Sequence, residues 1–151
     1  MTAIYDIMRE LETLLITDGI CNQVSAGDLS ELALQKQTVY PYAHIVLGNV
    51  DMPENLLTFN VSIICMEVVD VSKSDTTDLV KGNDNEQDAL NTTLGILSRL
   101  VEKLRRGDIR ESGYHLSGTP TAEPFLDDYA DKVAGWVLTL AFDYRNNMDK
   151  C

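Results

Sequence analysis

Two histidines are the first candidates for chemistry, because a neutral imidazole binds metals and acts as a base near neutral pH. His44 and His115 each stand in a strand-like run, without a second His or Cys at metal-ligand spacing. The motifs CxxC, HExxH and H-x-E do not occur in the chain. We therefore expect no zinc site.

The three cysteines, Cys21, Cys65 and Cys151, are odd in number and widely spaced. This pattern does not indicate a disulfide framework. Cys65 lies in an apolar, strand-like run, so we expect it to be a small core residue.

The sequence also lacks the motifs that position a nucleophilic serine or bind a phosphate group, because GxSxG, GxGxxG and GxxxxGK[ST] do not occur in it. Three acidic clusters remain, and none fits the calcium-loop pattern: Asp75 with Asp78, Asp84 with Glu86 and Asp88, and Asp127 with Asp128 and Asp131. We interpret them as solvated carboxylates. The sequence thus predicts no catalytic, cofactor-binding or metal-binding residue, and we do not expect an enzyme.

A basic group is the remaining candidate site, and it comprises Arg99, Lys103, Arg105 and Arg106. One interpretation is a solvated helix end, where positive charge complements the helix dipole. The other is a positive patch that meets the acidic surface of an identical neighbour and fixes its register. Asp75 and Asp78 could supply the acidic side of such a subunit interface.

The acidic net charge of the chain makes some classes of binding partner unfavourable. The 151 residues include 24 acidic and 12 basic side chains, for a formal net charge of −12. Such a surface disfavours direct binding to nucleic acid and to anionic membranes. No run approaches the roughly 18–20 apolar residues that span a bilayer, and the N-terminus lacks the pattern of a signal peptide. We expect one domain that stays where it is made.

Hydrophobic periodicity predicts a first helix over 2–18, with a stripe of Ile4, Met8, Leu11 and Leu15. Strands are expected over 42–50 and 56–71, paired as an antiparallel hairpin around a turn at 49–55. Residues 20–41 are mixed in character and predict no element.

A polar loop over 72–83 leads to a second helix that Asn83 can cap and that ends near Arg106. Its apolar stripe is formed by Leu90, Leu94, Leu97, Val101 and Leu104. Two prolines make 114–125 an expected edge strand, and a charged turn follows at 127–131. The last strand, 133–144, carries Trp136 on a wholly apolar face, and 145–151 reads as a polar, flexible tail.

The predicted fold class is α+β, in the order α-β-β-α-β-β. One mostly antiparallel or mixed sheet of about four strands would carry two main helices on one face, the face of Trp136. All of 1–151 would form a single domain.

The element order and the C-terminal half resemble the tail-terminator and tail-completion (neck) proteins of tailed bacteriophages. The resemblance is carried by the capped helix 83–106, by 118–125 (GTPTAEPF) and by 134–142 (AGWVLTLAF). It implies a structural virion subunit that forms a homo-oligomeric ring at or near the head–tail connection. Its partners would be further copies of itself and portal, neck or tail components. DNA would pass through the ring without sequence-specific binding, and no cofactor is implied.

The resemblance also places the protein in the virion, after assembly in the host cytoplasm. The acidic balance suits this role, because a negative channel wall would repel DNA and let it slide. The alternative from a different class is a small cytoplasmic binding or regulatory domain without catalytic activity, using its sheet face or a groove beside Trp136. The first hypothesis predicts self-association into a ring, whereas the second predicts a monomer or a dimer.

Overall fold

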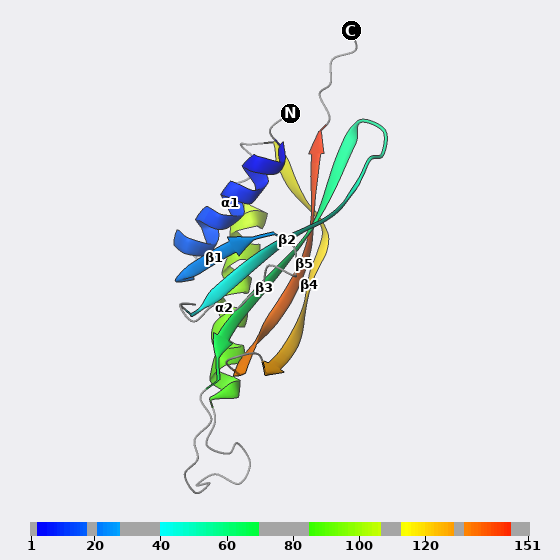
Figure 1. The fold of residues 1–151 in the computed structure, drawn as a ribbon. Coiled ribbons are helices and arrows are strands. Elements are labelled where there is room, and N and C mark those ends of the chain that lie inside the picture. The colour runs from blue at the N-terminus through cyan, green and yellow to red at the C-terminus, as the bar shows by residue number, and fades with distance from the viewer. Residues whose placement is uncertain are drawn as a thin grey trace, which may run out of the picture.

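Five strands and two helices make up the part of the chain that the computed structural model describes, which is residues 3–17, 21–27, 40–69, 85–106, 113–128 and 132–145. In chain order the elements are α1 (Ala3–Thr17), β1 (Gln23–Ala26), β2 (Tyr42–Asp51), β3 (Leu56–Val68), α2 (Glu86–Arg106), β4 (Tyr114–Asp128) and β5 (Lys132–Arg145). The strands form one sheet in the order β1-β2-β3-β5-β4. Figure 1 shows both helices on the same side of this sheet.

The sheet corrects the predicted strand count and element order. It has five strands rather than about four, and the order is α-β-β-β-α-β-β. The missed strand, β1, has only four residues and pairs in parallel with β2. Four residues are too few to show a clear alternation, so this strand depends on its neighbour. The other pairings are antiparallel, which confirms a mixed, mostly antiparallel sheet.

Several boundaries of the helices and strands differ from the predicted ones by a few residues. β3 ends at Val68 rather than 71, whereas β4 extends to Asp128, into the turn expected at 127–131. Arg145 belongs to β5 and not to a tail. The position of β4 at the end of the sheet confirms an edge strand. The loop 72–83 with its Asn83 cap, and residues 146–151, lie outside the described residues.

The main core lies between the helices and the Trp136 face of the sheet, as predicted. β5 contributes Leu138, Leu140 and Phe142 to this core, and Trp136 packs against it. The Trp136 Nε1–H donates a hydrogen bond of 2.9 Å to the Leu90 carbonyl, which ties β5 to α2. A second buried cluster, which the sequence did not suggest, lies on the other face and comprises Tyr42, Ile64, Met66 and Val133.

The helical stripes are buried only in part. In α1 the buried side chains are Ile7, Leu11, Leu14 and Leu15, whereas Ile4 is exposed. In α2 Leu97 and Leu104 are buried, but Leu94 is 38% exposed. Two apolar residues of the predicted stripes therefore lie on the surface, and both recur in the surfaces described below.

The central strands β3 and β5 leave no room for a Cβ at Gly135, which pairs with Met66. A Cβ atom at Gly135 would lie 1.9 Å from the Cys65 carbonyl oxygen and 2.9 Å from the Met66 Cα. These are backbone atoms inside the sheet and cannot turn aside. Only glycine permits this spacing.

Gly135→Ala should destabilise the fold by about 3 kcal/mol, because the strands must separate to admit a methyl group. Gly95→Ala is the matched control. No atom lies within 4 Å of a Cβ at Gly95, which is exposed within α2, so this change should stabilise by about 1 kcal/mol. Urea unfolding followed by circular dichroism measures both. Equal effects of the two changes would contradict the close approach at Gly135.

Tyr114 is a buried phenol at the start of β4, and its ring lies 4.9 Å from that of Tyr144. Burial raises the pKa of Tyr114 to about 12, with smaller contributions from Asp6 and Tyr144. The folded state therefore favours the neutral phenol more than the unfolded chain does, in which a tyrosine titrates near pH 10.

The stability that this shift contributes should be fully present below about pH 10 and lost as the pH rises to about 12. Tyr114→Phe should remove that part of the pH dependence. Urea unfolding midpoints between about pH 9 and about pH 12 give the comparison, because the wild type should lose more stability than the variant. Parallel curves would show that Tyr114 titrates normally.

Candidate interaction surfaces

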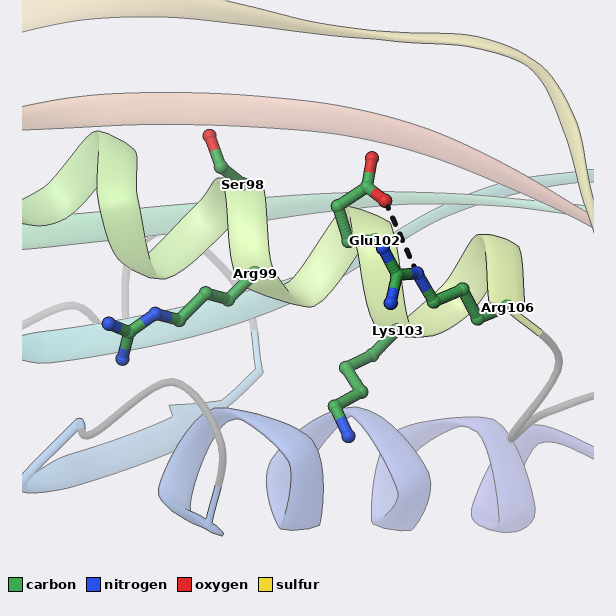
Figure 2. Close-up of a pocket in the computed structure, with 5 residues that line it drawn as sticks. All are labelled: Ser98, Arg99, Glu102, Lys103 and Arg106. Carbon is green, nitrogen blue, oxygen red and sulfur yellow. Dashed lines mark ion pairs between the residues drawn. The ribbon is translucent and has the colours of Figure 1, made fainter.

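The C-terminal half of α2 presents a cationic hollow to solvent. Ser98, Arg99, Glu102, Lys103 and Arg106 line it, and its volume is about 420 Å³. Helical spacing of three and four residues brings these side chains to one face. Figure 2 shows Lys103 reaching toward α1, Arg99 pointing toward the start of α2, and Arg106 folding back to Glu102. The structure thus brings together three of the four predicted cations.

Glu102 is the charged residue of this hollow that the sequence analysis did not name. Its carboxylate lies 3.5 Å from Arg105 Nη1 and 3.6 Å from Arg106 Nε. The spacing of Glu102 from the two arginines, at i+3 and i+4, is the signal that could have found it. All three side chains are more than half exposed, so these ion pairs contribute little to folding.

Arg105 faces a neighbouring groove between α2 and the edge strand β4. This groove has a volume of about 220 Å³ and is lined mainly by apolar side chains: Leu94, Leu97, Val101, Pro120, Ala122 and Leu138, with Ser98, Glu102 and Arg105 at its border. We call Leu94, Ser98, Arg99, Lys103, Arg105 and Arg106 the α2 patch. Ser98 and Glu102 belong to both hollows and stand between them.

The predicted acidic partners of these cations, Asp75 and Asp78, lie outside the described residues. Exposed carboxylates are found instead at the turn between β2 and β3, at Asp51 and Glu54. The sequence analysis treated this turn only as a connection.

A β-bulge shapes the end of the β2–β3 hairpin. Leu47 pairs with Val61 and Val50 pairs with Phe59, so Gly48 and Asn49 stand opposite Asn60 alone. Such a bulge bends a strand and increases its twist. A Cβ at Gly48 would lie 2.9 Å from the Asn60 carbonyl oxygen, which favours glycine here.

Side-chain hydrogen bonds brace the hairpin beyond this bulge. Asn60 Nδ2 donates to the Asn49 carbonyl at 3.2 Å and to Asp51 Oδ2 at 3.0 Å. Asn49 Nδ2 donates to Asp51 Oδ1 at 3.2 Å. The turn itself is closed by the Leu56 N–H, which donates to the Pro53 carbonyl at 3.3 Å, with Asn55 at a φ of 64°. The direction of the hairpin is therefore fixed by its own residues.

Exposed apolar side chains gather where this hairpin meets the start of α1. Tyr5 is 75% exposed and Met52 is 76% exposed. Together with Ile4, Val50, Leu57 and Phe59 they line a hollow of about 210 Å³. We call Ile4, Tyr5, Asp51, Met52 and Glu54 the hairpin patch. Its composition, apolar with two carboxylates, complements the cations of the α2 patch.

One polar group resembles a nucleophile with its base. Ser25 Oγ lies 2.6 Å from His44 Nδ1 and also contacts the hydroxyl of Tyr42. His44 is only 1% exposed, so a substrate has no access to its ring. These side chains join β1 to β2, and we assign them a structural role.

Within the described residues, no group of three or more His, Cys, Asp or Glu side chains is arranged to hold a metal ion. Cys65 is buried beside Cys21, and the hydrogen bond between the two thiols, together with burial, raises the pKa of Cys65. Neither described helix is long and apolar enough to cross a membrane. The chain matches no known family model and no curated protein sequence.

Replacing Arg99, Arg105 and Arg106 together by alanine should change the free energy of unfolding by less than about 1 kcal/mol, because these side chains are exposed. Urea unfolding monitored by circular dichroism measures the change. A loss of several kcal/mol in the free energy of unfolding would show that these arginines stabilise the fold itself, which would contradict a role in binding a partner alone.

Proposed function

We propose that this chain is a structural virion protein of a tailed phage, a tail-terminator-like subunit that forms a ring at or near the head–tail connection. Its partners are further copies of itself and neighbouring portal, neck or tail components. It works in the virion after assembly in the host cytoplasm. The proposal joins the resemblance of 83–106, 118–125 and 134–142 to the surfaces of the folded chain.

The observation that carries the proposal is the pair of unlike surfaces on one chain. The hairpin patch exposes Tyr5 and Met52 for three quarters of their area, and such apolar groups mark interaction sites when they gather. The α2 patch is cationic on a chain with a formal net charge of −12. A ring of identical subunits needs two different, complementary patches on each copy.

The acidic balance supports the remaining part of the proposal. The α2 patch contains four cations, and the hairpin patch contains two carboxylates. The rest of the chain still carries a large excess of Asp and Glu over Lys and Arg. A channel wall of that sign repels the DNA backbone, so DNA can slide through the ring without being held.

The purified protein, studied in reductant, should have the mass of a closed oligomer by light scattering after size exclusion, and negative-stain images should show rings. Tyr5→Glu should shift the population toward monomer, because it places a charge in the hairpin patch. Leu126→Glu is the matched control, since Leu126 is also exposed but lies on β4. A chain that stays monomeric over a wide concentration range would favour the alternative, a small binding or regulatory domain.

A further inference from the structure

The hairpin patch and the α2 patch complement each other in both charge and apolar character. We propose that the β2–β3 turn of one subunit docks on the α2 patch of the next copy, and that this contact repeats around the ring. The inference rests on the proposed function and goes beyond it by naming the two surfaces that meet.

Charge is the first argument. The turn carries two exposed carboxylates, Asp51 and Glu54, on either side of Met52 and Pro53. The α2 patch gathers four cations on one helix end, and Arg105 and Arg106 are paired with Glu102 through exposed side chains. This cluster stands on a chain whose acidic residues outnumber its basic ones by 24 to 12. An acidic turn is therefore a fitting occupant, and a second copy of the chain provides one.

Shape is the second argument. Met52 is an exposed, unbranched apolar side chain at the end of the hairpin, and methionine fills irregular apolar gaps. The groove beside Leu94, with Val101, Ala122 and Leu138, is mainly apolar and has a volume of about 220 Å³. Met52 in this groove would bring the carboxylates of the turn toward Arg105, which lines the same groove.

Preorganisation is the third argument. The bulge at Gly48 and Asn49 and the bonds from Asn60 to Asp51 hold the turn in one direction before any partner arrives. A surface that is already ordered loses less conformational entropy on binding.

The arrangement of the elements makes the contact one between copies. The hairpin turn lies at the start of α1, where Met52 lines a hollow with Ile4 and Tyr5, whereas the groove beside Leu94 lies between α2 and β4. The hairpin hollow shares no lining residue with the hollows of the α2 patch in the same chain, so the proposed contact is one between copies. A contact between two different patches on successive copies propagates in one direction, which closes into a ring when the rotation permits.

A cysteine pair tests this contact. In a Cys151→Ser background, Met52→Cys and Ser98→Cys are introduced into the same chain, and the protein is oxidised mildly. Ser98 is the reporter because it borders both hollows of the α2 patch. The expected result on a non-reducing gel is a ladder of cross-linked species that ends at a closed ring and collapses with reductant. Cys21 and Cys65 are buried and should stay out of the reaction.

The matched control carries Met52→Cys with Glu123→Cys, an exposed position on β4 that lies on the face opposite the helices. It should give roughly tenfold less product, because the contact raises the local concentration of only the first pair. No excess over the control would overturn the docking arrangement. Native mass of the parent protein then separates the two proposals, since a ring without the cross-link leaves the proposed function standing. Cross-linked dimers alone would support the contact but overturn the ring.

Discussion

The close pairing of β3 with β5 is the constraint on which the other features depend. The two strands pair continuously from Leu56 opposite Arg145 to Val68 opposite Val133, and glycine at 135 avoids a clash with the β3 backbone. β3 is also one strand of the hairpin, whereas β5 carries Trp136, which holds α2 by its hydrogen bond to Leu90. One ladder therefore fixes the position of the hairpin relative to α2.

Both candidate surfaces consist of residues that the hydrophobic core does not bury. The core takes the buried side of each helix, so Ile4 and Leu94 stay exposed although they belong to the apolar stripes. Arg105 and Arg106 contact Glu102 through exposed ion pairs, which stabilise the chain weakly. Residues that add so little to folding are available for contacts with another molecule.

The hairpin shows how a local irregularity becomes a directed surface. A regular antiparallel pair would continue the twist of the sheet. The bulge opposite Asn60 changes that course, and the amide of Asn60 then holds Asp51 and Asn49 in place. Apolar and acidic side chains at the turn are presented in a fixed arrangement as a result.

The sequence by itself determined the α+β class, both helices, the four long strands and the face of the sheet that receives the helices. Periodicity carries this information because the burial of one face repeats every 3.6 residues in a helix and every two in a strand. The sequence also grouped Arg99, Lys103, Arg105 and Arg106 at the end of α2, and the structure then separates Arg105 into a neighbouring groove. The sequence did not predict β1, because four residues are too few to show a periodic pattern. The place of β1 beside β2 depends on a long-range pairing.

Only the tertiary structure decided which surfaces the chain offers. Tyr5 and Met52 are far apart in the sequence, and they meet because β2 and β3 bring the turn to the start of α1. The bulge at Gly48 is visible only as a shift in pairing register, which no residue pattern along one strand reveals. The groove beside Leu94 likewise needs β4 next to α2. Local pattern fixed the elements, whereas packing between distant segments fixed the surfaces, because those contacts join residues whose separation along the chain carries no periodic signal.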